Sequence, residues 1–214
     1  MDTIHFHNVL PHVFAQTPHL HSEIWQNTVS FEKGHLYLVE ADSGKGKSTF
    51  CSYIVGYRHD YTGTVSFDDA DVSAFNMKAW TEMRQRHISY LFQELRLFPE
   101  LTAWENVAIK NNITHHQTDD TLKQWFERLG VADKIDTKIA HMSFGQQQRV
   151  AMIRALSQPF DFILVDEPIS HLDDTNAAIM ADIMMAEARR QGAGVIVTSI
   201  GKHMHLEYEK TLKL

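Results

Sequence analysis

The residues with the most specific chemistry in this sequence form a glycine-rich segment that follows the apolar run 36–39. The segment consists of Ala41, Asp42, Ser43, Gly44, Lys45, Gly46, Lys47, Ser48 and Thr49. An order of strand, glycine loop and helix is typical of polyphosphate-binding loops, because successive backbone N–H groups and the positive end of the helix point at one place. Lys47 would hold the outer phosphates, and Ser48 would place its hydroxyl on the bridging magnesium ion. The alternative is a surface turn rich in glycine, lysine and serine.

Two adjacent carboxylates, Asp166 and Glu167, follow the unbroken apolar run 160–165. Such a run is typical of a central parallel strand that is buried on both faces. Carboxylates at the end of a buried strand are costly unless a cation or a reacting group uses them. Asp166 would hold magnesium through water, and Glu167 would be the general base that deprotonates an attacking water. The alternative is an acidic turn.

Two further side chains are candidates for the same chemistry. Gln93 ends the short apolar strand predicted at 88–92, where its amide could bind magnesium or the attacking water. It could equally hydrogen-bond to the backbone at the end of the strand. Phe14, between the first predicted strands, is a candidate platform for an adenine ring, although an aromatic residue in such a region also serves as core.

A second helix start lies at 143–146. Ser143 and Gln146 have the spacing of a capping box, and this structural role alone would explain both residues. A helix N-terminus with Gly145 at its second position is also an anion site, which a protein with one phosphate loop would not need for itself. This additional anion site therefore indicates that the N-terminus of this helix binds the nucleotide of a partner.

The composition is that of a globular protein of 214 residues, long enough for one domain with an inserted subdomain. The formal charge of −7 and the lack of a dense basic block argue against a nucleic-acid partner. Cys51 has no second cysteine to pair with and is expected to be a small buried hydrophobe. The fourteen histidines do not converge at ligand spacings, so solvated or half-buried rings are favoured over a metal site. No apolar segment is long enough to cross a bilayer, and the N-terminus has no secretion signal, so a cytoplasmic protein is expected.

The periodicity of apolar residues predicts alternating strands and helices, and hence a mainly parallel sheet. Strands are predicted at 3–10, 28–32, 35–39, 63–68, 88–92, 160–165 and 195–197, with an edge strand within 207–214. Helices are predicted at 79–86, 104–110 behind Thr102 and Glu105 as a capping box, 119–129, 144–156 and 176–191. Helical patterns dominate 73–141, which indicates an inserted helical subdomain.

Taken together, these segments resemble the ATP-binding subunit of an ATP-binding-cassette (ABC) transporter over nearly the whole chain. The matched motifs are the Walker A loop at 41–49, the Q-loop glutamine Gln93, the signature motif at 143–147, Walker B at 162–166, the catalytic glutamate Glu167, and the D-loop with Ser170 and Asp173. The segment 101–107 is similar to the lipoprotein-releasing, macrolide-export and cell-division type of this family.

The resemblance implies one α/β domain: a P-loop NTPase core with a mainly parallel sheet, an antiparallel β-rich N-terminal part and an inserted α-helical subdomain. The core would take in 1–72 and 153–214, and the helical subdomain 73–152. It further implies ATP and Mg²⁺ as cofactors, with Ser48, Gln93 and Asp166 around the metal and Lys47, Gln93 and Glu167 in catalysis. Two subunits would meet head to tail, so that Ser143, Gly145 and Gln146 bind the nucleotide of the second subunit. A separate transmembrane permease would hold the protein at the inner face of the membrane.

Three residues depart from the family pattern. Ala41 replaces the first Walker A glycine, which costs about 1 kcal/mol where the backbone needs a positive φ and almost nothing otherwise. Phe144 replaces the first signature glycine and would put a ring beside the partner's γ-phosphate. Ser199 stands where the family has a switch histidine, and His203 comes four residues later. The sequence therefore leaves two functions open, a transport ATPase and a nucleotide-gated regulatory or structural subunit that scarcely hydrolyses ATP.

Overall fold

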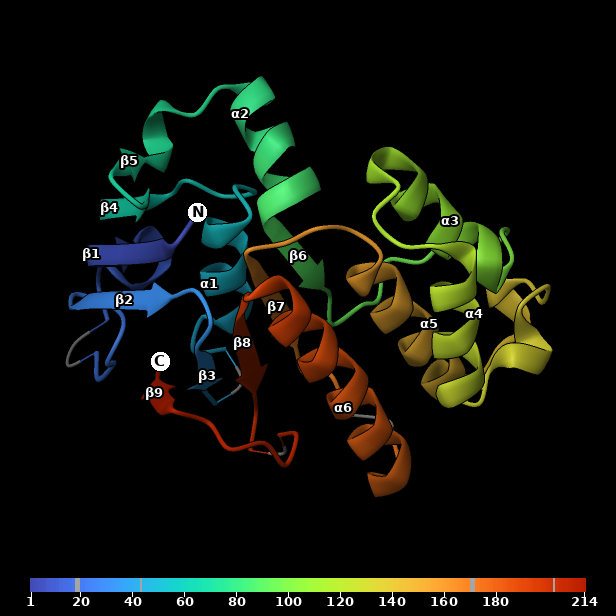
Figure 1. Cartoon of the computed structure of the whole chain (residues 1–214). Helices are drawn as coiled ribbons and strands as arrows, with labels where there is room; N and C mark the ends of the chain where they lie inside the picture. Colours follow the sequence, from blue (N-terminus) through green and yellow to red (C-terminus); the bar gives the residue numbers. More distant parts are fainter. Residues whose placement is uncertain (18–19, 43, 170–171, 202) are drawn as a thin grey trace.

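The computed structural model describes residues 1–17, 20–42, 44–169, 172–201 and 203–214. Two sheets and a group of helices make up the chain (Figure 1). The strands are β1 (Thr3–Pro11), β2 (Thr28–Glu32), β3 (Leu36–Glu40), β4 (Tyr61–Phe67), β5 (Ala70–Asp71), β6 (Ile88–Leu91), β7 (Phe162–Asp166), β8 (Gly194–Ser199) and β9 (Lys210–Lys213). The helices are α1 (Lys47–Ile54), α2 (Met77–Glu82), α3 (Ala103–Thr114), α4 (Asp119–Arg128), α5 (Phe144–Leu156) and α6 (Asp174–Gln191).

The larger sheet has five strands in the order β6-β7-β8-β3-β9, and every neighbouring pair is parallel. The smaller sheet has the order β2-β1-β4-β5 and is antiparallel. Both findings confirm the predicted fold class. The expected edge strand is β9, which is shorter than predicted and pairs with β3.

Alternate side chains of the parallel strands enter two different cores, as the two-residue period of a strand requires. In β7, Ile163 and Val165 pack with α5 and α6, whereas Phe162 and Leu164 pack with α1 and the antiparallel sheet. The parallel sheet is therefore covered on both faces. Cys51 is fully buried in the second core, as expected.

Helices α3, α4 and α5, all of which begin within 73–152, lie together on the right of Figure 1, while β6 joins the parallel sheet. Thr102 accepts a hydrogen bond from Glu105 N (3.1 Å) and its own N–H donates to Glu105 Oε2 (2.8 Å), which confirms the predicted capping box. The predicted helix at 79–86 is divided into α2 and a π-helical turn at Met83–His87. The π-helical turn was not predicted because its hydrogen bonds run from i to i+5, whereas the prediction used the α-helical period of apolar residues. None of the helices in the described ranges is both long and apolar enough to span a membrane.

Candidate active site

The candidate site lies at the edge where the parallel strands reach their carboxyl ends. Strand register places Asp166 of β7 opposite Thr198 of β8, and Ser199 opposite Glu40 of β3. The glycine loop leaves β3 at this edge, so residues from distant parts of the sequence meet there. Ligands of open α/β sheets bind at this edge for the same reason.

The glycine loop has the backbone that its glycines permit. Gly44 has φ 80° and Gly46 has φ 102°, both in the left-handed region, and Gly46 is the N-cap of α1, which begins at Lys47. Ala41 is not among the residues with positive φ, so alanine in place of glycine carries no backbone strain at this position. The Ala41 N–H donates to Ser199 O (3.1 Å), which ties the loop to the end of β8.

Phe14 packs directly on the glycine loop. A Cβ atom added at Gly46 would lie 2.9 Å from the Phe14 ring, closer than real Cβ contacts, so the ring and the loop exclude a side chain at this position. Phe14 and the loop residues Gly44, Lys47 and Ser48 line one hollow of about 310 Å³. The structure therefore brings the proposed base platform and the proposed phosphate loop to the same hollow.

Lys47, Gln93 and Glu167, the three predicted catalytic residues, converge at this hollow. Lys47 Nζ lies 3.2 Å from Glu167 Oε1, and Gln93 Nε2 donates to Glu167 Oε2 (3.2 Å). The side chains of Lys47 and Glu167 are 7% and 15% exposed, so the pair is shielded from water and its attraction is stronger than on the surface. A polyphosphate entering the loop would compete with Glu167 for the lysine charge.

Glu167 also has an unusual backbone. Its φ of 49° places a non-glycine residue in the left-handed region, and its N–H donates to Thr198 O (3.1 Å) beside the end of β8. Such strain costs about 1–3 kcal/mol and is concentrated at functional sites. The strained backbone turns the Glu167 carboxylate toward Lys47 and Gln93 instead of continuing the strand.

Asp166 is held by two hydroxyl groups. Thr198 Oγ1 donates to Asp166 Oδ1, and Tyr90 OH donates to Asp166 Oδ2 at 3.3 Å. Burial raises the pKa of Asp166, which is 3% exposed, while the Thr198 hydrogen bond opposes that rise. Burial also raises the pKa of the Tyr90 phenol, so it remains a neutral donor. Carboxylate, hydroxyl and amide oxygens are ligand types that suit Mg²⁺. Ser48 and Gln93 line the hollow, whereas Asp166 is not among its lining residues and would act through water.

Tyr90→Phe is predicted to raise the Mg²⁺ concentration needed for half-maximal nucleotide binding about three- to tenfold, because Asp166 loses one donor. Titration calorimetry with ATP at varied Mg²⁺ measures this, alongside the melting temperature. Tyr57→Phe is the matched control, since Tyr57 is 48% exposed and does not contact Asp166. An unchanged Mg²⁺ requirement in Tyr90→Phe would contradict a positioning role for the hydroxyl.

Sequence reasoning missed several residues of the hollow. Val13, Arg58 and Ile200 line it, and Arg58 Nη1 donates to Thr49 Oγ1 (3.0 Å) while its guanidinium pairs with Asp60 (2.5 Å). Arg58 lies nine residues after Thr49, and no motif marks it. Thr198 could have been predicted as a site residue, because it follows the apolar run 195–197 at the end of a predicted strand.

The signature residues do not lie at this hollow. Ser143 and Gln146 form the predicted capping box of α5: Gln146 N donates to Ser143 Oγ (3.3 Å) and Ser143 N donates to Gln146 Oε1 (2.9 Å). Gly145 follows in the first turn, and Phe144 is 41% exposed. Helix α5 lies among α3 and α4, well away from α1 (Figure 1). Within one chain the glycine loop and these residues remain apart.

Asp173 is the N-cap of α6: its Oδ1 accepts from Asn176 N (2.9 Å), and this bond lowers the pKa of Asp173. Ser43 of the glycine loop and Ser170 of the D-loop lie outside the described residues. His203 does not line the hollow; its ring packs edge-on against Tyr208 (5.4 Å between centroids) and Nδ1 lies 3.0 Å from Met204 O. The residue nearest in sequence to Ser199 that does line it is Ile200.

A glycine loop at the start of a helix, with a lysine beside a strand-end glutamate, defines a P-loop nucleotide-binding fold. The family model described as ABC transporter matches residues 26–170. The chain is 30% identical over 173 residues to the ABC transporter ATP-binding protein YtrE of Bacillus subtilis. The aligned stretch covers 79% of this chain and 75% of that protein. The chain belongs to the ABC transporter family.

Two further similarities agree with this assignment. The lipoprotein-releasing system ATP-binding protein LolD of Zymomonas mobilis is 28% identical over 185 residues, 85% of this chain and 80% of that protein. The solved structure of the dimeric bacterial ABC transporter cassette MJ0796 superposes with a TM-score of 0.72 at 24% identity, and covers 92% of this chain and 87% of that one. The first confirms the resemblance to the lipoprotein-releasing type, and the second shows the fold.

Proposed function

We propose that this protein binds ATP with Mg²⁺ and hydrolyses it to ADP and phosphate, as the energising subunit of an ABC transporter. The observation that carries the proposal is the convergence of Lys47, Gln93 and Glu167 beside the glycine loop. The loop backbone and Lys47 would hold the phosphates, and Phe14 would stack on the adenine. Bound Mg²⁺ would supply charge neutralisation between the outer phosphates. Glu167 would take the proton of the attacking water, and Gln93 would orient the carboxylate that does so.

The phosphate-binding part of the site comprises the whole loop in this proposal, namely Ala41, Asp42, Ser43, Gly44, Lys45, Gly46, Lys47, Ser48 and Thr49. The second half of the site would come from another copy of the chain, through Ser143, Gly145 and Gln146, with Ser170 and Asp173 between the subunits. Support comes from the position of α5, whose N-terminus lies away from the loop of its own chain, and from the relative MJ0796, which was solved as a dimer. A homodimer joined by ATP is the arrangement that uses both halves.

The proposed partner is a separate membrane-spanning permease. It would convert the ATP-driven closure of the homodimer into transport. The relatives YtrE and LolD are named as ATP-binding proteins of a transporter and of a lipoprotein-releasing system, which supports such a division between chains. The protein would then act at the inner face of the membrane, held there through its partner. Nucleic acid is not expected as a partner because of the net charge of −7.

A second function is favoured by two particular residues. Phe144 at the signature and Ser199 at the switch position each replace a residue that the family places near the γ-phosphate. Loss of one preorganised contact to the transition state costs about 10²- to 10³-fold in rate. The chain could therefore be a nucleotide-gated regulatory or structural subunit that closes on ATP and hydrolyses it slowly.

Lys47→Met is predicted to weaken ATP binding about 10- to 100-fold, because a charge-assisted contact to phosphate is lost. Fluorescence titration with a labelled ATP analogue measures the affinity. Lys78→Met is the matched control: Lys78 is exposed on α2, does not line the hollow and makes no ion pair with a described residue. Equal affinities for the two variants would contradict the assignment of Lys47, and absence of ATP binding by the wild type would contradict the proposed function.

A further inference from the structure

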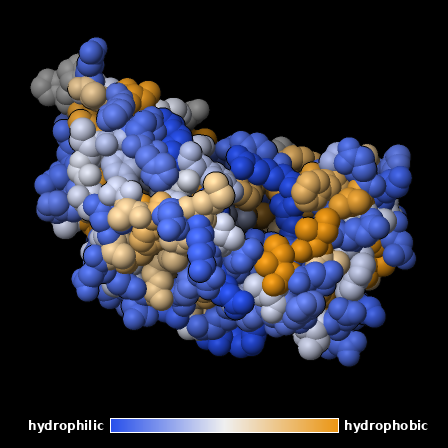
Figure 2. All heavy atoms as spheres, turned by 90° about the horizontal axis from the view of Figure 1, so that it is seen from above, coloured by the Kyte–Doolittle hydropathy of each residue, from blue (hydrophilic) through white to orange (hydrophobic). Residues whose placement is uncertain are grey.

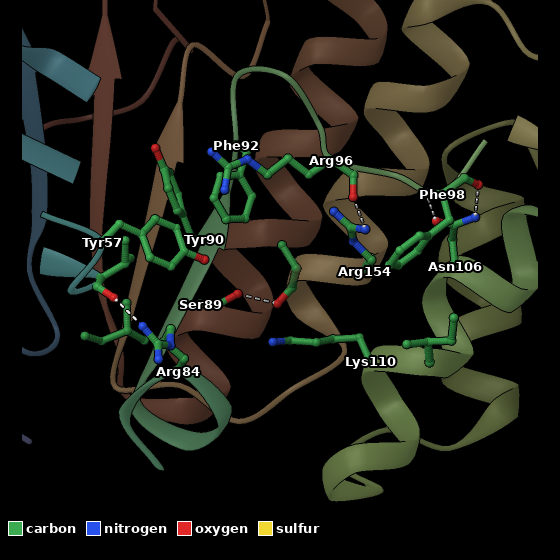
Figure 3. A pocket seen from close by; sticks show the side chains of 14 residues that line it. Tyr57, Arg84, Ser89, Tyr90, Phe92, Arg96, Phe98, Asn106, Lys110 and Arg154 are labelled. Atoms are coloured by element: carbon green, nitrogen blue, oxygen red, sulfur yellow. Dashed lines mark hydrogen bonds between the residues drawn. The ribbon is translucent and has the colours of Figure 1, made fainter. Parts of the chain in front are cut away.

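Arg58 lines the nucleotide hollow and lies in the turn between α1 and β4, outside every motif of the site. Its neighbour Tyr57 lines a second hollow, where it stacks on Phe92 with 6.2 Å between ring centroids (Figure 3). The second hollow opens on the face that carries α2 and α3, where the surface is indented (Figure 2). Among the described residues the two hollows share no lining residue. Arg58, unlike Tyr57, therefore faces the nucleotide.

The chain holds the Arg58 guanidinium in a fixed position. Its Nε and Nη2 donate to the Asp60 carboxylate (2.9 and 2.5 Å), and its Nη1 donates to Thr49 Oγ1 (3.0 Å). The guanidinium carbon lies 5.9 Å from the centroid of the Tyr53 ring. A guanidinium carries five N–H donors. These contacts use three of them, so two N–H groups have no partner within the described ranges.

The turn that carries Arg58 is tied to both ends of the nucleotide site. The carbonyl oxygen of Asp60 accepts from His12 N (2.9 Å) and from the Tyr53 hydroxyl (3.0 Å). His12 begins the 3₁₀ turn His12–Phe14, which ends in the proposed adenine platform. Tyr53 belongs to α1, which starts in the glycine loop. Arg58 is therefore fixed relative to the adenine platform and to the phosphate loop.

The geometry of α1 indicates which phosphate Arg58 can reach. Lys47 and Thr49 are two residues apart, so their side chains point about 200° apart around the helix axis. Lys47 faces Glu167 (3.2 Å), where the outer phosphates and the attacking water are proposed to lie. Thr49 and Arg58 lie on the other side of the helix start and line the same hollow as Phe14. The phosphate next to the sugar must pass this side on the way from Lys47 to Phe14.

Asp60 competes with a phosphate for Arg58. The hydrogen bonds from Arg58 lower the pKa of Asp60, so this carboxylate is ionised and repels phosphate. The two side chains are 40% and 41% exposed, and an ion pair exposed to this degree contributes little to stability. A phosphate can therefore share the guanidinium with Asp60 at small cost.

We propose that Arg58 binds the α-phosphate of the nucleotide, the one next to the sugar, through its two remaining N–H groups. This inference rests on the proposed function and adds a specificity residue to that site. The α-phosphate is common to ATP and ADP, whereas Lys47 is assigned to the outer phosphates. Arg58 would therefore strengthen the binding of substrate and product alike, and would slow the release of ADP after hydrolysis.

Arg58→Gln is expected to weaken the binding of ADP and of an ATP analogue with a β,γ-imido bridge by the same factor, about tenfold, because one charge-assisted contact is lost. Titration calorimetry of the full chain with Mg²⁺ measures both affinities. Arg86→Gln is the matched control, since Arg86 is exposed, pairs with Glu82 and does not line the hollow. An unchanged affinity for ADP in Arg58→Gln, or a loss confined to the triphosphate, would overturn the inference.

Asp60→Asn separates phosphate binding from a role in holding the turn together. If Arg58 served only to stabilise the turn through Asp60, both variants would bind nucleotide more weakly. The inference instead predicts opposite effects: Asp60→Asn should bind ADP about two- to threefold more tightly, because a competing carboxylate is removed while the Asp60 backbone contacts remain. Melting temperatures show whether each variant is folded. Weaker ADP binding by a folded Asp60→Asn variant would overturn the inference.

ADP that carries sulfur on its α-phosphate locates the contact, because sulfur accepts hydrogen bonds more weakly than oxygen. One stereoisomer should bind to the wild type more weakly than ADP, and this difference should shrink in Arg58→Gln. An equal difference in both proteins would overturn the assignment to the α-phosphate. Absence of nucleotide binding by the wild type would defeat the proposed function, whereas normal wild-type binding that Arg58→Gln leaves unchanged would defeat only this inference.

Discussion

Glu167→Gln is expected to lower steady-state phosphate release about 10²- to 10⁴-fold while ATP affinity stays within about threefold of the wild type. Glutamine keeps the shape of the side chain and can still receive the Gln93 amide hydrogen bond, but it cannot accept a proton from water. It also loses the ion pair with Lys47 (3.2 Å), which frees the lysine for phosphate. The affinity for ATP should therefore be unchanged or slightly higher, and only the rate of ATP hydrolysis should fall.

The measurement is phosphate release at saturating ATP and Mg²⁺ for wild type, Glu167→Gln and Glu94→Gln. Glu94 is an exposed carboxylate next to Gln93 and has no ion pair with a described residue, so its change should leave the rate unaltered. Size-exclusion chromatography with ATP should show more dimer for Glu167→Gln, because a subunit that does not hydrolyse ATP remains closed. Equal rates for wild type and Glu167→Gln would instead favour the nucleotide-gated subunit with little turnover.

The sequence was sufficient for the architecture because the apolar patterns are strong. The run at 160–165 has no polar interruption, and the structure shows β7 between two parallel neighbours with both faces covered. Once parallel strands are expected, their carboxyl ends must share one edge, and this places Asp166, Glu167 and the glycine loop together. The convergence of Gln93 with Glu167 was predictable for the same reason, since β6 ends at that edge too.

Contacts that depend on side-chain packing across elements were not predictable. The hydrogen bond from Tyr90 to Asp166 requires the relative rotation of β6 and β7, and Arg58 reaches Thr49 only because the chain turns back after α1. Phe14 was a candidate by residue type alone, and its packing on Gly46 depends on a loop conformation that no pattern encodes. The hollow lined by Arg84, Arg96, Lys110 and Arg154 was missed because these four residues are spread along the chain and form no basic block in the sequence.

The largest expected gain of function is at Ser199, which ends β8 and whose carbonyl oxygen accepts from Ala41 N (3.1 Å). The family has a histidine there that contacts the γ-phosphate. If the slow-turnover hypothesis holds, Ser199→His should raise phosphate release about 10²-fold or more, because a preorganised donor to developing charge is restored. Ser199 is fully buried, so the larger ring must turn toward the adjoining hollow.

The test compares rates and melting temperatures of wild type, Ser199→His and His203→Ala. His203→Ala tests whether His203 takes the place of the missing switch histidine. Because His203 packs against Tyr208 and does not line the hollow, its removal should leave the rate of phosphate release unchanged. A folded Ser199→His variant with the wild-type rate, where the wild type already hydrolyses ATP at an ordinary rate, would remove the case for a slow subunit. A slow wild type that Ser199→His does not accelerate would instead move the cause to Phe144, whose exposed ring at the start of α5 would then be the element that keeps two subunits from closing fully on ATP.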